Sequence, residues 1–136
     1  MIALRRNFLK RSVALLAGGG LTQFAMAQPT KNPPLAHNVY FWMNNPDNDE
    51  EAAKLASGIK SLADVKMVKG FRLGKPAATA ARDVVDNSYS YHLMLLFDNA
   101  RDQDAYQTDP IHEKFVKECS GLWKEVKVYD SDSSSV

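Results

Sequence analysis

Hydrophobic residues in the second part of the chain follow two periods, one typical of strands and one typical of helices. Residues 37–43 read His-Asn-Val-Tyr-Phe-Trp-Met, and residues 88–97 alternate an aromatic and aliphatic set with a second, largely apolar set. Runs of this length and composition are typical of strands. Because both faces of these runs are apolar, each predicted strand needs cover on both sides.

The first predicted helix follows the first strand. Asp47 is its predicted N-cap, and Glu50 three residues later resembles the second member of a capping box. Apolar residues then recur at helical spacing, which predicts one buried stripe. This stripe consists of Ala52, Leu55, Ala56, Ile59, Leu62 and Ala63.

The second helical region runs from residue 99 to about residue 122 and contains a proline in its middle. Asp109 can cap a new helix, and Pro110 can occupy its first position, where a missing N–H costs nothing. The sequence therefore predicts that the helix restarts at Pro110. Phe115, Cys119 and Leu122 form the core stripe of the restarted helix, so Cys119 is predicted to be a buried small residue, and Gly121 is its predicted stop.

Two further strands complete the pattern, at residues 65–73 and 123–130, with Val126 and Val128 facing away from Trp123 and Tyr129. The order βαββαβ predicts an α+β fold of the ferredoxin-like class. Two helices cover only one face of the sheet. The other face would be an apolar patch too large for a soluble monomer.

The first 27 residues are predicted to be a twin-arginine signal peptide. Arg5 and Arg6 precede Asn-Phe-Leu-Lys, a weakly apolar run follows, and Ala-Met-Ala at residues 25–27 is a cleavage site before Gln28. An uncleaved membrane helix is disfavoured because the run is too short to span a bilayer. We expect a periplasmic or secreted protein with no membrane contact after cleavage.

The mature chain divides by composition into three parts. Residues 28–34 hold three prolines and are predicted to be a flexible lead-in, residues 35–130 form the folded domain, and the serine-rich residues 131–136 are predicted to be a disordered tail. A domain of this size is close to the limit at which a single core is stable alone.

Charge and residue counts exclude several classes of function. The chain has 17 basic and 16 acidic residues, and cleavage removes four arginines and lysines, leaving 13 against 16, a net charge of −3. No basic cluster remains, so nucleic acid is a poor partner. The three histidines lack metal-ligand spacing, and no phosphate loop or dinucleotide fingerprint is present, so we expect neither a metal nor a cofactor.

Five stretches resemble the stress-responsive A/B barrel family (Dabb domains), and the resemblance covers essentially all of residues 36–130. The Tyr-Gln-x-x-Pro-x-His core after a strand that ends in Phe-Asp is the most specific of them. The five stretches are HNVYFWM, FRLGK, YHLMLLFD, AYQTDPIHEKF and VKVYD. The resemblance implies a ferredoxin-like subunit and a homodimer, a dimeric α+β barrel in which two subunits pair their sheets face to face.

The resemblance also implies candidate site residues. One plant member of the family is a polyketide cyclase, and its catalytic tyrosine and histidine match Tyr106 and His112. Tyr106 would polarise a substrate carbonyl, and His112 would be a base at the third position of the restarted helix. The helix dipole disfavours a charged His112, whereas Asp109 and Glu113 favour it.

Three more residues are candidates for ligand contact. His37 begins the first strand, as in the family, and Tyr91 stands where the cyclase has a further pocket histidine, which is a departure from the pattern. Trp42 could stack on a ligand, as could Trp123, although aromatic residues on inner strand faces usually belong to a core.

Two functions from different classes remain open at this point. One is a non-catalytic, exported homodimer that binds a small apolar or aromatic ligand or acts in stress tolerance. The other is a metal-independent acid–base enzyme, a polyketide-cyclase-like lyase that uses Tyr106 and His112. A purely structural pair would instead have these two side chains bonded to backbone groups at the helix break.

Overall fold

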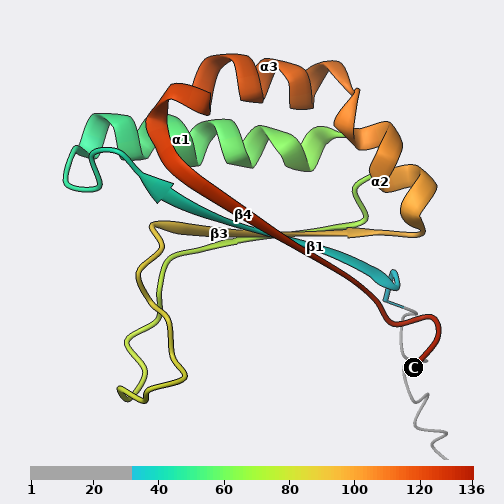
Figure 1. Cartoon of the computed structure of the whole chain (residues 1–136). Coiled ribbons are helices and arrows are strands. Elements are labelled where there is room, and N and C mark those ends of the chain that lie inside the picture. The colour runs from blue at the N-terminus through green and yellow to red at the C-terminus, as the bar shows by residue number, and fades with distance from the viewer. Residues whose placement is uncertain (1–31) are drawn as a thin grey trace, which may run out of the picture. The chain divides into compact units, whose positions relative to one another are not determined.

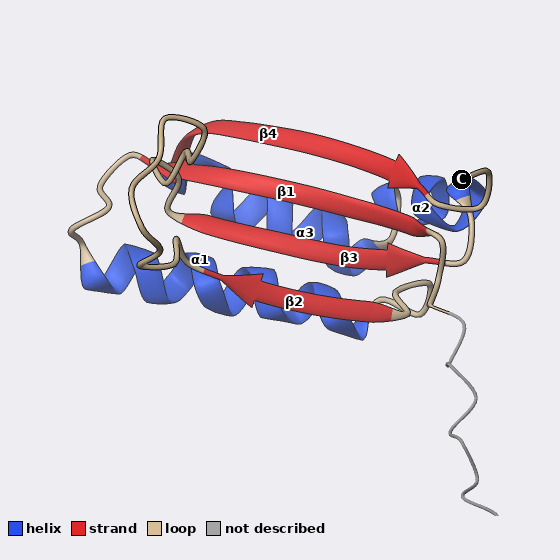
Figure 2. Cartoon of the chain, turned by 90° about the horizontal axis from the view of Figure 1, so that it is seen from below, coloured by secondary structure: helices blue, strands red, loops and turns tan. Residues whose placement is uncertain are grey.

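The computed structural model describes residues 32–136, and the predicted signal peptide at residues 1–27 lies outside the described residues. The described unit contains one antiparallel sheet in the order β2-β3-β1-β4 (Figures 1 and 2). The central strands are β1 (Leu35–Met43) and β3 (Tyr91–Phe97), and the edge strands are β2 (Gly70–Gly74) and β4 (Trp123–Asp132).

All helices of the described unit lie on one face of the sheet, which we call the helix-side face (Figure 1). They are α1 (Asp49–Ser61), α2 (Ala100–Gln107) and α3 (Pro110–Cys119), with single turns η1 (Leu62–Asp64) and η2 (Ser120–Leu122). The view from below shows the four strands in front of the helices (Figure 2). This arrangement confirms the predicted ferredoxin-like α+β fold.

The alternation of side chains along the strands determines where the hydrophobic core lies. Burial alternates residue by residue along β1 and β3, so that every second side chain is buried beneath the helices. The buried residues of α1 and α3 close the core from the other side, as their predicted stripes require. The core consists of Leu35, Val39, Phe41, Met43, Leu55, Ile59, Leu62, Val65, Tyr91, Leu93, Leu95, Phe97, Tyr106, Phe115 and Cys119.

The helix restart at Pro110 is confirmed. The Asp109 carboxylate accepts a hydrogen bond from the backbone N–H of Ile111 at 2.8 Å, and Pro110 begins α3. Cys119 is buried, as predicted, and burial raises the pKa of its thiol. The helix restart and the burial of Cys119 could both be predicted locally, because capping and helical spacing need no information from distant residues.

The start of α1 differs from the prediction. Asn48, not Asp47, is the N-cap, and its side-chain oxygen accepts from the N–H groups of Glu50 and Glu51 at 3.1 Å. The reason is a turn that precedes the helix, in which the Asn48 N–H donates to the Asn45 carbonyl at 3.1 Å. Ala63 lies beyond the end of α1 and is exposed, so it is not part of the buried stripe.

Two strands are shorter than predicted, because turns occupy part of their sequence. β2 begins at Gly70 rather than at residue 65, since Val65 closes η1 and the Val68 N–H donates to the Val65 carbonyl at 2.9 Å. β3 begins at Tyr91 rather than at Ser88. Val65 still enters the core, so its hydrophobicity served burial and not strand pairing.

β4 differs from the prediction in length and in the direction of one side chain. It runs to Asp132, because Ser131 and Asp132 pair with Ala36 and Leu35, so these two residues belong to the sheet and not to the tail. A register shift leaves Trp123 opposite Met43. Trp123 therefore shares the helix-side face with Val126, although simple alternation placed the two on opposite faces.

The other side of the sheet, which we call the outer face, carries none of the helices of residues 32–136. Its two central rows come from the strand register: Arg72, Met94, Asn38 and Tyr129 in one, and Gly74, His92, Tyr40 and Lys127 in the next. The loop of residues 75–90 lies on this side and borders a hollow of about 490 Å³ together with Tyr40, Trp42 and Tyr129. No helix among residues 32–136 has the length and apolar character that crossing a membrane requires.

Candidate functional site

A cavity of about 170 Å³ lies between the helix-side face and the second helical region. Strands β1, β3 and β4 form its floor, and η1, α2 and α3 form its roof, so distant segments of the sequence meet there. Most of its wall is aliphatic or aromatic. The lining residues are His37, Val39, Phe41, Leu62, Leu93, Tyr106, Gln107, His112, Phe115, Val116, Trp123, Val126 and Val128.

Tyr106 and His112 both line this cavity, and His112 also bonds to a backbone carbonyl at the helix break, as a purely structural residue would. Tyr106 is near the end of α2 and His112 is the third residue of α3, and their ring centroids are 4.5 Å apart. The break at Pro110 makes this possible, because the chain turns between the two helices. The Tyr106 side chain is almost fully buried, and burial raises the pKa of its phenol far above the usual value. Tyr106 is therefore a neutral hydroxyl at physiological pH.

The hydrogen bond of His112 fixes its tautomer. Its Nδ1 lies 3.0 Å from the carbonyl oxygen of Gln107, which can only accept, so Nδ1 carries the proton. In the neutral ring Nε2 is then an unprotonated acceptor. Burial lowers the pKa of His112, outweighing the Gln107 carbonyl and the carboxylates of Asp109 and Glu113, which raise it. In the folded protein the balance that the sequence analysis left open therefore favours the neutral imidazole.

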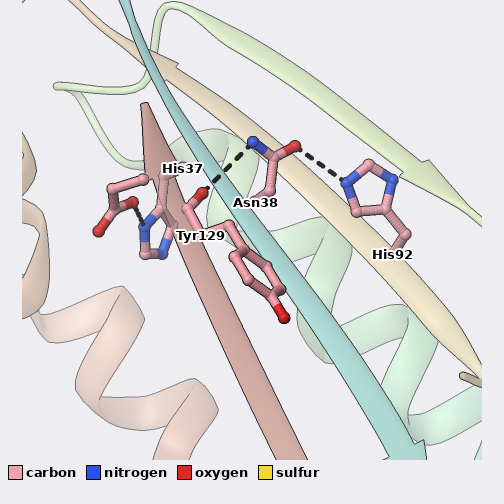
Figure 3. A network of polar contacts seen from close by, with 5 residues as sticks. His37, Asn38, His92 and Tyr129 are labelled. Atoms are coloured by element: carbon pink, nitrogen blue, oxygen red, sulfur yellow. Dashed lines mark hydrogen bonds and ion pairs between the residues drawn. The ribbon is translucent and has the colours of Figure 1, made fainter. Parts of the chain in front are cut away.

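His37 lies beside the pair and has a partner that the sequence analysis missed. Its ring centroid is 5.9 Å from that of Tyr106, and its Nδ1 is 2.6 Å from an Asp130 carboxylate oxygen (Figure 3). His37 is buried, whereas Asp130 is half-exposed. The register of β1 and β4 sets this contact, because His37 is paired directly with Asp130.

The structure separates the other two candidates from this cavity. Tyr91 shares the helix-side face, but its hydroxyl donates to the carbonyl of Ala52 on α1 at 3.2 Å. Trp42 lies on the outer face, where its indole N–H donates to the Ser88 hydroxyl at 2.9 Å. Neither lines the Tyr106–His112 cavity. The structure thus brings together three of the five candidates, Tyr106, His112 and His37.

Trp123 lines the cavity, and Asp130 contacts His37 beside it; the sequence analysis named Trp123 only as a residue that could stack on a ligand and did not name Asp130. Trp123 stacks on Phe115 with ring centroids 5.7 Å apart, and it also lines the cavity. The position of Asp130 could have been predicted from the sequence, because it continues the alternation of Val126 and Val128 along one face of the strand. For Trp123 the signal was misleading, because the register shift in β4 reverses its side.

The mouth of the cavity lies along β4. Val126 and Val128 are 43% and 48% exposed although they belong to the helix-side face. β4 is an edge strand, and α3 does not cover it fully, since Val116 on α3 is also 39% exposed. The exposed edge of the cavity is therefore apolar, and its polar lining residues are His37, Tyr106, Gln107 and His112. Among the residues described, no group of three or more His, Cys, Asp or Glu side chains could hold a metal ion.

Solved structures with the same fold come from plants and bacteria. An Arabidopsis thaliana protein is 21% identical at a TM-score of 0.63, over 76% of this chain and 98% of that one. A dimeric ferredoxin-like protein of unknown function from Thermobifida fusca is 16% identical at 0.60, over 75% and 92%. The hydroxynitrile lyase from Passiflora edulis is 15% identical at 0.64, over 76% and 97%. At these identities the likeness shows the fold alone.

Sequence comparison identifies the family. No curated protein has a sequence that matches this chain. The family model described as Stress responsive A/B Barrel Domain (Dabb) matches residues 35–133, which include all four strands and all three helices. The chain therefore belongs to the stress-responsive A/B barrel domain family.

Proposed function

We propose that this chain is an exported homodimer that binds a small apolar or aromatic molecule in the cavity beneath α2 and α3, in a role in stress tolerance. One observation carries the proposal. In a cavity whose wall is otherwise largely apolar, the polar side chains of Tyr106, His112 and His37 converge. Apolar walls with a few convergent polar groups are the usual composition of small-molecule sites.

The volume and lining restrict the ligand. At about 170 Å³ the cavity is smaller than the roughly 300 Å³ at the low end of ligand pockets, so the bound part of the ligand is small. Neutral Tyr106 donates a hydrogen bond and Nε2 of neutral His112 accepts one. A carbonyl next to a hydroxyl matches this donor and acceptor, and the ring of Trp123 supports a flat, apolar remainder.

The homodimer is supported by the outer face. Two half-buried aromatic residues, Tyr40 and Trp42, lie there with Met94 and Leu96, and no helix covers them. The Thermobifida fusca protein with this fold is described as dimeric. Pairing two outer faces would bury these side chains without obstructing the cavity, which is on the helix side of the sheet.

The test is to purify the exported protein and analyse it by native mass spectrometry. The expected result is a dimer that retains a small molecule, which is then released and identified. His112→Gln should lose the ligand and keep the dimer. A ligand that remains bound after both Tyr106→Phe and His112→Gln would contradict this site, and a monomer at micromolar concentration would contradict the dimer.

A second candidate function is acid–base catalysis, and the His112 tautomer favours it. With Nδ1–H bonded to Gln107, Nε2 can remove a proton from a ligand hydroxyl, while Tyr106 stabilises a developing oxyanion by hydrogen bonding. Cyanohydrin cleavage is one such reaction, in which the base takes the hydroxyl proton, the C–C bond breaks, and cyanide leaves from a new carbonyl group. Cyanide release by the purified protein, abolished by His112→Gln, would establish it. If the protein binds cyanohydrins or ketones but does not convert them, only the binding function is supported.

A further inference from the structure

The outer face contains a histidine that has no part in the cavity. His92 lies on β3 and faces away from the helices, and its ring is half-buried. It stacks on Tyr40 of β1 with ring centroids 4.5 Å apart and an interplanar angle of 18°. β1 and β3 are the two central strands, so His92 lies near the middle of the face that the proposed dimer buries.

A hydrogen-bond chain holds the His92 ring in place. Its Nε2 lies 3.1 Å from the Asn38 side-chain oxygen, and the Asn38 amide donates to the Tyr129 carbonyl at 3.4 Å (Figure 3). Because Asn38 donates through its nitrogen, its oxygen faces His92 as an acceptor, and Nε2 carries the proton. The fixed ring therefore completes a polar strip across β3, β1 and β4.

Burial and a neighbouring positive charge both oppose protonation of His92. Burial lowers the pKa of His92 first, and Arg72 on the neighbouring strand β2 lowers it further. On the other side Lys127 of β4 pairs with Glu125 at 3.0 Å, and Asp86 lies in the loop that borders the same face. The only cation among these without a carboxylate partner on this face is Arg72, which disfavours a second positive charge beside it.

We propose that His92 makes the homodimer sensitive to pH, so that two copies associate through their outer faces when His92 is neutral and separate when it is protonated. The inference rests on the proposed dimer. Association removes more water from a half-buried imidazole and brings two copies of His92 and Arg72 into one interface. Both effects penalise imidazolium, because a buried charge without a partner is costly.

The direction in which pH changes dimer dissociation follows from proton linkage. Since the dimer disfavours charged His92 more than the monomer does, the pKa of His92 is lower in the dimer. In the separated subunit, burial and Arg72 already hold the pKa of His92 below the usual histidine value of about 6.5. As pH falls to that lowered pKa, the separated subunits bind more protons than the dimer does, which shifts the equilibrium toward monomers. Each unit of pKa difference changes the dissociation constant about tenfold per histidine, and a dimer contains two.

The experiment is sedimentation equilibrium of the full chain between pH 7.5 and pH 5.0, with circular dichroism to verify that the fold is unchanged. The wild-type dissociation constant should rise at least tenfold at pH 5.0. His92→Gln, which keeps a donor for Asn38 and cannot be charged, should remove this rise. His112→Gln, on the helix side of the sheet, is the matched control and should leave the rise intact.

The outcomes separate this inference from the dimer itself. A dimer that is equally tight at both pH values, or a His92→Gln dimer as pH-dependent as wild type, overturns the inference and leaves the dimer standing. A monomer at pH 7.5 overturns both. If His92→Gln fails to fold, the His92 pKa measured by NMR decides the question, because it must fall as the protein concentration rises through the dissociation constant.

Discussion

Individual residues of the cavity have complementary protonation states. Tyr106 is protonated at neutral pH, as tyrosines ordinarily are, and burial raises its pKa further, whereas His112 stays neutral because burial lowers its pKa. The pair therefore offers one donor and one acceptor near neutral pH. The unfolded chain binds a proton at His112 more readily than the folded one, so this residue costs stability as pH falls through about 6.5 and down to its lowered value.

Removing the Tyr106 hydroxyl distinguishes a role in ligand binding from a role in stabilising the fold. The Tyr106 hydroxyl makes no hydrogen bond to another residue of the described chain, so Tyr106→Phe should change the unfolding free energy by less than about 0.5 kcal/mol. It should nevertheless release the co-purified ligand. Melting temperature and ligand retention are measured together. A loss of about 1–3 kcal/mol with the ligand retained would mean that the hydroxyl has a structural partner.

Elements of this fold are positioned by close contacts that local pattern does not reveal. Gly58 on α1 faces α3 closely enough that a Cβ built there would lie 2.6 Å from the Cys119 sulfur and 3.1 Å from Phe115. α1 and α3 can approach in this way because neither residue 58 nor residue 119 is large. The buried cysteine thus has a packing role, and the glycine serves tertiary contact although it costs helix propensity.

Gly58→Ala should lower the unfolding free energy by about 1–3 kcal/mol, because overpacking outweighs the gain in helix propensity. Denaturant unfolding is the measurement. Gly121→Ala is the matched control, since a Cβ there would meet no atom within 4 Å, and it should change little. Adding Cys119→Ala to Gly58→Ala removes the sulfur, so the double variant should be more stable than the sum of single effects by at least about 0.5 kcal/mol. A stabilised Gly58→Ala would contradict the close contact.

At the scale of the whole molecule, export and assembly are the two proposals outside the cavity. Export rests on Arg5, Arg6 and the Ala-Met-Ala site before Gln28. Replacing both arginines by lysine should trap the precursor in the cytoplasm, because the transport route reads this pair. Cell fractionation and N-terminal sequencing are the measurements, and the exported protein should begin at Gln28. Export that persists in the double variant would contradict the twin-arginine assignment.

The sequence by itself determined most of the described fold and part of the site. Capping at Asp109, the restart at Pro110 and the alternation along β1 and β3 are local properties, so they could be predicted from adjacent residues. Tyr106 and His112 could be proposed as a pair because the sequence resembles a family in which one member has its catalytic tyrosine and histidine at the matching positions. Pattern alone failed where turns compete with strand pairing, as at Val65, which is buried without belonging to β2.

The tertiary structure alone decided which candidates share the cavity. His37 meets Asp130 because β1 and β4 pair in one particular register, across 93 residues of sequence. A single register shift brings Trp123 into the cavity wall, and strand parity puts Trp42 on the opposite face. The neutral state of His112 also depends on tertiary structure, because its first cause is burial by segments distant in sequence. These features depend on how strands align and what covers them, and adjacent residues do not encode that.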